Sequence, residues 1–250
     1  MKGRQIMNTA FYTAASGVLW HQKSMDIASN NIANVSTVGY KPQKTAFGDL
    51  LYTTMLNEDK RKNDNLQVGH GVKIEGVNLD FAQGSLVPTD RQLDFALVTD
   101  GFFAVEKPDG TYGYTRAGNF SLKLEDENAY VVDSSGNYVL NKDMERITLK
   151  KDENGKDDYA AFINEIGVFD FKIKYGLSLD GNNLYLQTEL SGEAEPVGDY
   201  KIMQGYLENS GVEMSKQMVE MIEIQRSFQF NARVVQIADE LEQEVNGLRT

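Results

Sequence analysis

The sequence of 250 residues contains no cysteine and only two histidines, His21 and His70. The absence of cysteine excludes a disulfide framework and a thiolate-bound metal site, although it does not decide the compartment. Neither histidine belongs to a metal-binding or catalytic motif, and no nucleophile elbow, phosphate-binding loop or dinucleotide-binding glycine motif is present. The sequence therefore predicts a protein that is not an enzyme, with no catalytic, cofactor-binding or metal-binding residues.

Long apolar runs and net positive charge are also absent. No stretch approaches the roughly 20 apolar residues that a membrane-spanning helix needs, and the first residues lack the apolar core of a cleaved signal peptide. The formal net charge of -12 repels phosphate backbones. We therefore expect no membrane insertion, no nucleic-acid partner, and an export route without signal cleavage if the protein leaves the cytoplasm.

Proline is scarce: the four prolines lie between Pro42 and Pro196, so both ends of the chain are free of it. The N-terminal end predicts an amphipathic helix that ends near Asn34, because Gly39 and the residues before it favour a reversal. Its apolar residues recur at steps of three and four and form one stripe, which consists of Phe11, Ala14, Val18, Met25, Ala28 and Ile32, with His21 on the same side.

The C-terminal end predicts a longer helix, from Gly211 to Leu248. Ser210 is the expected N-cap, with Glu213 three residues later as in a capping box. The spacing suits coiled-coil-like packing against another helix, and the stripe consists of Met214, Met218, Met221, Phe228, Val235, Ala238, Leu241, Val245 and Leu248.

Short β-strands separated by turn residues are predicted between the two helices. Their spacing is typical of a sandwich or barrel, with strands expected at 93–98, 102–105, 111–115, 119–124, 129–133 and 138–140. Residues 177–179 and 184–186 flank Asp-Gly-Asn-Asn and predict a hairpin. The acidic residues of 150–158 do not fit the spacing of an EF-hand and predict a solvated loop.

The predicted fold class is therefore mixed α and β, with terminal helices that form a coiled-coil-like stalk and a β-rich central domain. Four zones follow from this reading. Residues 1–40 form an N-terminal assembly helix and motif, 41–92 an extended linking arm, 93–200 a β-rich outer domain, and 201–250 a C-terminal assembly helix.

Residues 30–41, NNIANVSTVGYK, resemble the N-terminal signature of the bacterial flagellar rod and hook proteins. Further segments resemble the same family, namely FGDLLY (47–52), VGHGV (68–72), QGSL (83–86), LDFALVTDGFFAV (93–105), YTRAGNF (114–120), LENSGV (207–212) and MIEIQRSF (221–228). Two positions depart from the family pattern: Gly211 stands where asparagine is usual, and Phe228 where tyrosine is usual. Residues 141–200 match only weakly.

The resemblance implies a structural subunit that assembles helically into the basal-body rod, the shaft that transmits torque for motility. Its implied partners are further copies of itself, other rod and hook subunits, the ring proteins around the rod and the flagellar type III export apparatus. Its implied location is the basal body, in the periplasm or cell-wall zone. The chain length and two of the matching segments, 47–52 and 68–72, favour the distal rod.

The terminal helices would then supply the assembly interface. The residues expected in it are Phe11, Val18, Met25, Asn30, Asn31, Ile32, Asn34, Gly39, Met214, Met221, Phe228, Val235, Ala238, Leu241, Val245 and Leu248. Two alternatives stay open from the sequence. One is a proximal rod or short hook subunit, and the other is a β-domain on a helical stalk that binds or hydrolyses cell-wall glycan.

Overall fold

The computed structural model describes residues 2–49, 52–56, 62–69, 72–125, 128–149 and 159–248. It divides into two compact units. The helical unit consists of Met1–Ala33, Gln43–Leu79 and Glu213–Thr250, and the β unit of Asn34–Pro42 and Asp80–Val212. The mixed α and β class, with a helix near each end and a β-rich middle, is confirmed. The four predicted zones stay a prediction; in this division most of the linking arm groups with the helices.

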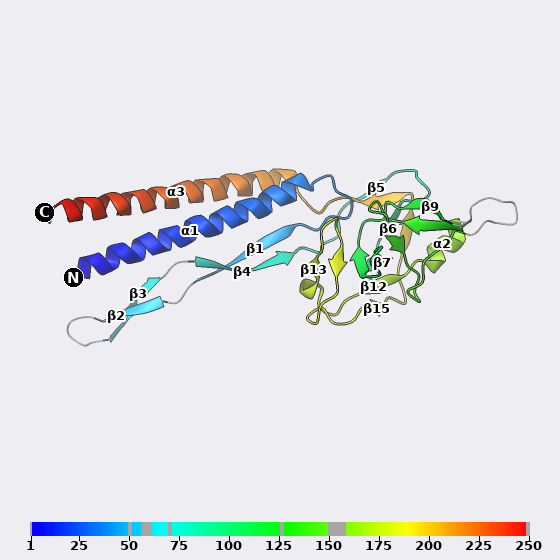
Figure 1. Cartoon of the computed structure of the whole chain (residues 1–250), viewed down its shortest axis with the longest axis horizontal. Helices are drawn as coiled ribbons and strands as arrows, with labels where there is room; N and C mark the ends of the chain where they lie inside the picture. The colour runs from blue at the N-terminus through cyan, green and yellow to red at the C-terminus, as the bar shows by residue number, and fades with distance from the viewer. Residues whose placement is uncertain are drawn as a thin grey trace. The chain divides into compact units, whose positions relative to one another are not determined.

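Two long helices, α1 (Lys2–Ala33) and α3 (Met214–Gly247), pack along each other in the helical unit, as Figure 1 shows in blue and red. Helix α1 ends beside the predicted Asn34. Helix α3 begins three residues later than expected, and the predicted capping box is wrong, because the N-cap is Glu213 and makes no side-chain cap bond. The Gly211 amide instead donates to the Tyr40 carbonyl at 2.9 Å, which ties this residue to another segment before the helix starts.

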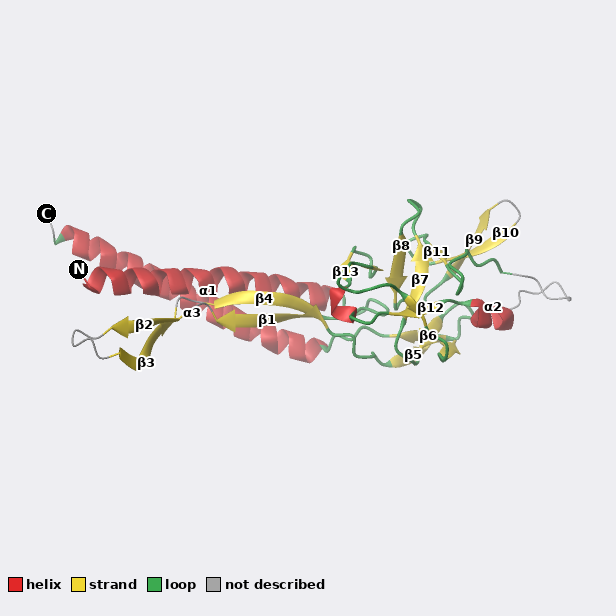
Figure 2. Cartoon of the chain, turned by 90° about the horizontal axis from the view of Figure 1, so that it is seen from below, coloured by secondary structure: helices red, strands yellow, loops and turns green. Residues whose placement is uncertain are grey.

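The predicted linking arm forms β-hairpins. Strand β1 (Gln43–Asp49) pairs antiparallel with β4 (Val72–Leu79), in a register that begins at Gln43 opposite Leu79. Both strands also contact α1. Strands β2 (Tyr52–Leu56) and β3 (Lys62–Gly69) form a second antiparallel pair, visible beyond the first in Figure 2. His70 lies outside the described residues.

The β unit contains a sheet of nine strands with the core order β13-β14-β8-β7-β11-β10-β9, to which β12 and β15 attach through β7. Its strands are β7 (Phe102–Glu106), β8 (Tyr112–Thr115), β9 (Ser121–Glu125), β10 (Asn128–Val132), β11 (Tyr138–Val139), β12 (Val168–Asp170), β13 (Ser178–Leu179), β14 (Tyr185–Leu186) and β15 (Glu195–Pro196). The expected hairpin at 177–186 is confirmed, with Leu179 opposite Tyr185. The predicted loop 150–158 lies outside the described residues.

Two short strand pairs accompany this sheet. Strand β5 (Leu86–Pro88) pairs with β17 (Tyr206–Glu208), and β6 (Phe95–Leu97) with β16 (Ile202–Gln204). A 3-10 helix, η1 (Lys174–Gly176), and a short helix that the sequence did not predict, α2 (Tyr159–Glu165), complete the unit. Helix α2 contributes Phe162 to a core that also includes Phe95, Phe103 and Val139. A sandwich-like or barrel-like stacking stays a prediction.

Candidate functional site

Where α1 meets α3, the face of α1 is formed by small and polar residues, and the face of α3 also carries large apolar side chains. On each helix, one series of buried and half-buried positions recurs in steps of three and four, the spacing that keeps one seam facing a partner helix. They are Ala14, Gly17, His21, Ser24, Ala28 and Asn31 on α1, and Gln217, Met221, Ile224, Phe228, Asn231, Val235 and Ala238 on α3. A Cβ at Gly17 would lie 2.7 Å from Nδ2 of Asn231, and the Asn31 side chain donates a hydrogen bond to Gln217. The contact positions rise along α1 as they fall along α3, so the two helices run antiparallel.

The predicted stripes differ from this contact face in part. On α1, Phe11 is 36% exposed, while Val18, Met25 and Ile32 are half-buried beside the small residues that occupy the seam. On α3, Met221, Phe228, Val235 and Ala238 lie on the seam, whereas Met214, Leu241, Val245 and Leu248 are exposed. Ala14, Ala28 and His21 of the predicted α1 side lie on the seam, while its larger apolar residues lie beside the seam. Small side chains at the seam let the two backbones approach closely. The assembly role of these residues stays a prediction.

Helix α3 carries a second apolar stripe that does not face α1. In an α-helix each residue is rotated by about 100° from the one before it. By this rotation the members of the stripe fall within one sector about 100° wide, on the side opposite the seam. They are Val219, Ile222, Phe230, Ile237, Leu241 and Leu248. Phe230 is 68% exposed and Leu248 89% exposed. Helix α1 likewise exposes Tyr12 and Leu19. Charged residues such as Arg226 and Arg233 lie among these apolar side chains on α3. Exposed apolar residues gathered on one side of a helix are candidates for an interaction site in a soluble protein.

A buried amide cluster surrounds Asn31, which is 1% exposed. Its side chain donates to the Gln43 carbonyl at 2.8 Å and accepts from the Gln43 amide at 2.9 Å. It also donates to Oε1 of Gln217 at 3.1 Å, and Gln217 in turn donates to Oε2 of Glu220. One side chain thus joins the end of α1, the start of β1 and the start of α3.

The other asparagines of the signature have different environments. Asn30 is exposed, one position away from the seam. Asn34 accepts from the Thr37 hydroxyl at 3.1 Å, and its carbonyl accepts from the Thr37 amide, which forms the turn after α1. Only Asn31 of the three is fully buried among segments that are distant in sequence.

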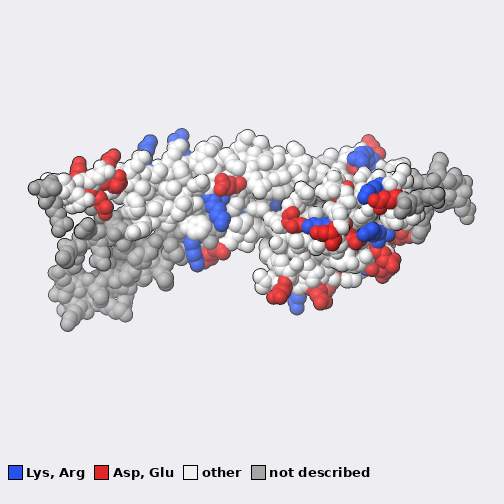
Figure 3. Space-filling view, in the orientation of Figure 1, with Lys and Arg blue, Asp and Glu red and all other residues white. Residues whose placement is uncertain are grey.

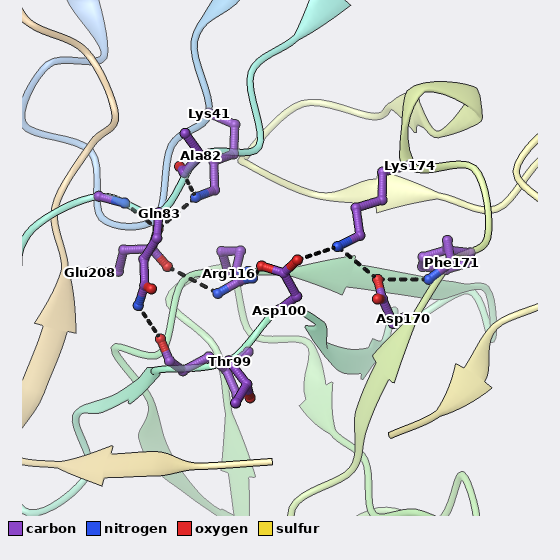
Figure 4. Close-up of polar contacts among 12 residues, drawn as sticks. Lys41, Ala82, Gln83, Thr99, Asp100, Arg116, Asp170, Phe171, Lys174 and Glu208 are labelled. Carbon is purple, nitrogen blue, oxygen red and sulfur yellow. Dashed lines mark hydrogen bonds and ion pairs between the residues drawn. The ribbon is translucent and has the colours of Figure 1, made fainter. Parts of the chain in front are cut away.

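A buried charge cluster lies in the β unit, where Lys41 and Glu208 are each 1% exposed. The Lys41 amino group donates to Oε1 of Glu208 at 2.6 Å and to the Ala82 carbonyl at 2.7 Å. The same Glu208 oxygen accepts from the Gly84 amide at 2.8 Å. Figure 4 shows the Lys41 amino group between the Ala82 carbonyl and Glu208.

The cluster extends toward the surface through Arg116, which is 3% exposed. Arg116 lies 3.4 Å from the second oxygen of Glu208 and 3.7 Å from Asp100, whose other oxygen is 3.1 Å from Lys174. The Arg116 guanidinium also lies 5.7 Å from the ring centroid of Phe102. Lys174 reaches Asp170 at 3.3 Å, so alternating charges continue from the interior to the exposed Asp100 and beyond (Figure 4).

Burial and pairing act on these groups in opposite directions. Burial lowers the pKa of the Lys41 amino group, and the attraction of Glu208 opposes that effect. The hydrogen bond from Lys174 lowers the pKa of Asp100. In the helical unit, burial lowers the pKa of His21 on the seam. Every strong charge in the buried cluster has a partner of opposite sign, which is the arrangement that a buried ion needs.

Gly39 of the signature also lies against this cluster. It has φ +66°, and a Cβ there would come within 2.6 Å of the Arg116 carbonyl carbon. Its amide donates to the Glu208 carbonyl at 2.8 Å. The close approach and the left-handed backbone both require glycine.

Four of the sequence segments that resemble the rod and hook family therefore meet at one place. They contribute Lys41, Gly84, Arg116 and Glu208. The first three are 92 to 167 residues away in sequence from Glu208, to which each of them bonds. Sequence reasoning quoted these segments but assigned no role to their charged residues. A lysine, an arginine and a glutamate inside otherwise uncharged motifs are the signal that could have identified them.

Within the described part of the chain, no group of three or more histidine, aspartate or glutamate residues could hold a metal ion. Among the same residues, no helix is long and apolar enough to cross a membrane. On the face of the β unit in Figure 3, acidic and basic side chains are interspersed. The arrangement fits packing and assembly.

Three regions of the chain match known protein families. Residues 11–41 match the flagella basal body rod protein family, 96–168 the flagellar hook protein FlgE/F/G D1 domain, and 203–248 the flagellar basal body rod FlgEFG protein C-terminal domain. These matches include α1, much of the main sheet and α3.

Whole-length relatives agree with these matches. The flagellar basal-body rod protein FlgG of Borreliella burgdorferi is 32% identical over 97% of this chain and 99% of its own length. FlgG of Caulobacter vibrioides is 32% identical over 96% and 99%, and FlgG of Bacillus subtilis is 31% identical over 97% and 100%. The chain therefore belongs to the flagellar basal-body rod protein family.

Proposed function

We propose that this protein is a structural subunit of the bacterial flagellar basal-body rod and that it joins neighbouring subunits through its helical unit. The observation that carries the proposal is the two-sided helix α3. One side meets α1, while the opposite side presents Ile222, Phe230 and Ile237 at 54–68% exposure. Exposed large apolar residues on the side of α3 away from α1 favour contact with a second partner.

Its place in the rod is proposed to be the distal part, since the relatives above carry the name FlgG. In this proposal α1 and α3 form a coiled-coil-like stalk, and copies assemble helically with other rod and hook subunits to transmit torque. The ring proteins around the rod and the flagellar type III export apparatus are the remaining proposed partners, with export that needs no cleaved signal.

The test compares two substitutions at adjacent exposed positions of α3. Phe230→Asp places a charge on the outer stripe, where burial without a counter-ion is costly. Gln229→Asp introduces the same charge at an exposed position beside that stripe. Both variants are expressed in a strain that lacks the native gene, and motility and isolated basal bodies are examined.

We expect Phe230→Asp to abolish rod completion and motility without lowering the thermal midpoint of the soluble protein. Gln229→Asp should retain both. Val235→Asp, on the seam, should lower the thermal midpoint as well. Motile cells with complete rods from Phe230→Asp would remove the outer stripe from the assembly surface, and a motile deletion strain would refute the rod function itself. The position at which rods stop in the deletion strain distinguishes the distal from the proximal rod.

A further inference from the structure

The chain passes between its two compact units four times, after Ala33, Pro42, Leu79 and Val212. These four covalent links are the only backbone connections that carry load from one unit to the other. Each link begins or ends in a segment of the β unit, and those segments are 34–42, 80–84 and 208–212.

Inside the β unit, the buried charge cluster ties these segments together. Lys41 donates to the Ala82 carbonyl and to Glu208, while Glu208 accepts from the Gly84 amide. Backbone bonds reinforce the arrangement: Gly39 donates to the Glu208 carbonyl, Gly211 donates to the Tyr40 carbonyl, and Asp80 donates to the Pro42 carbonyl at 2.9 Å. A force on one segment therefore acts on all three.

Inside the helical unit, the Asn31 cluster ties together the segments in which the four links begin or end on that side. Asn31 holds the end of α1 to the Gln43 backbone and to Gln217 near the start of α3. Gln43 is opposite Leu79 in the β1–β4 register, which brings in the remaining link. Buried polar clusters thus gather the four links on both sides.

We propose that the Lys41–Glu208 and Asn31–Gln217 clusters act as load-sharing clamps, so that a pull or twist on one helix is distributed over all four chain links. The ion pair holds segments that are separated by 167 residues in sequence, and its burial shields it from water and salt. When the segments at the ends of the four links are bonded to one another, a force on one link is shared by the others, and it takes a larger force to break the contacts of any single link. The physiological role of this clamp rests on the proposed rod function, but its mechanics do not.

Single-molecule pulling on the full-length protein tests the clamp directly. The chain has no cysteine, so two introduced cysteines give unique attachment points. Gln22→Cys lies on an exposed position of α1, and Ser134→Cys on an exposed turn of the β unit. Force between these points crosses from α1 to the β unit through the chain links, and the link after Ala33 is the direct continuation of α1.

Three further substitutions are compared in this background. Lys41→Met and Asn31→Ala each remove one clamp, while Val139→Ala opens a cavity in the main-sheet core, away from the links. We expect both clamp variants to lose the initial high-force rupture or to shift it to lower force. Val139→Ala should leave the force of that first rupture unchanged, even where it lowers the thermal midpoint as much.

Equal first-rupture forces in Lys41→Met and the parent, or in Lys41→Met and Val139→Ala, would overturn the clamp. If Lys41→Met does not fold, Glu208→Gln is measured with the same two outcomes, since it keeps the shape of the side chain and its acceptor for Gly84. A weakened first rupture together with a motile deletion strain would leave the clamp standing and refute the rod function. The opposite pair of results would do the reverse.

Discussion

Asn31→Ala provides a sharp test of how the helical unit is held together. The side chain is 1% exposed and makes two hydrogen bonds to the Gln43 backbone and one to Gln217. Asn30, its neighbour, is exposed. Asn30→Ala therefore makes the same chemical change on the same helix, outside the buried cluster.

The expected size of the effect follows from these contacts. Three hydrogen bonds at about 1 kcal/mol each are lost, and the Gln217 carbonyl oxygen loses its buried donor. Alanine is the better helix former and offsets this by about 0.5 kcal/mol. We expect Asn31→Ala to lower the free energy of unfolding by about 2–3 kcal/mol, and Asn30→Ala to change it by less than about 0.5 kcal/mol.

The assay must report on the helical unit alone, because two compact units need not unfold together. Trp20 is the single tryptophan of the chain and lies on α1, so its fluorescence during urea unfolding follows this unit. Equal unfolding midpoints for the Asn31 and Asn30 variants would refute the reasoning. Equal midpoints would mean that the hydrogen bonds of the buried amide cluster add no stability beyond that of the hydrogen bonds to water that they replace.

Gly39→Ala should lower the thermal midpoint of the β unit by an amount equivalent to more than about 2 kcal/mol, because a left-handed backbone costs an L-residue about 1–2 kcal/mol and the added Cβ meets the Arg116 backbone at 2.6 Å; an unchanged midpoint would contradict this. Ser24→Ala should raise the thermal midpoint of the helical unit by the equivalent of up to about 1 kcal/mol, since the Ser24 hydroxyl is buried and has no hydrogen-bond partner within the described residues; a loss of stability would show that this hydroxyl is satisfied. Arg146→Met should reduce the acid sensitivity of the β unit, because the Arg146 hydrogen bonds lower the pKa of Glu106. A carboxyl group whose pKa is lowered in the folded state stabilises the fold at pH values above its ordinary pKa of 4.5. This contribution is lost as the pH falls through the folded-state pKa. The difference in unfolding free energy between wild type and variant should therefore shrink at acid pH, and a constant difference would contradict the assignment.

Local sequence patterns predicted most of the elements but few of the contacts between them. Alternation and turn residues located the strands near Phe102 and Tyr138 and the hairpin at 177–186, because these features depend on neighbouring residues. The β1–β4 pairing joins segments about 30 residues apart, and no local pattern encodes it. The same limit applies to the bond between Asn31 and Gln217, which are 186 residues apart.

The family resemblance found from the sequence motifs is confirmed, yet the motifs alone did not explain their own residues. NNIANVSTVGYK suggested capping and a reversal, and the turn after α1 accords with that reading. The roles of Asn31 and Lys41 required the fold, since their partners come from the other end of the chain. A buried charge is informative only once its counter-ion is known.

The two sides of α3 suggest that folding and assembly of the helical unit are coupled. On the α1 side, the seam is built largely from small and polar residues such as Gly17, Ser24 and Asn31, which bury little apolar area. The outer stripe holds larger side chains, including Ile222 and Phe230, that are more than half exposed. Since hydrophobic stabilisation grows by roughly 25 cal/mol for each Å² of apolar surface buried, much of what these helices can gain is unused in a single chain. Specific polar contacts set the register of the pair, and neighbouring subunits would supply further apolar burial.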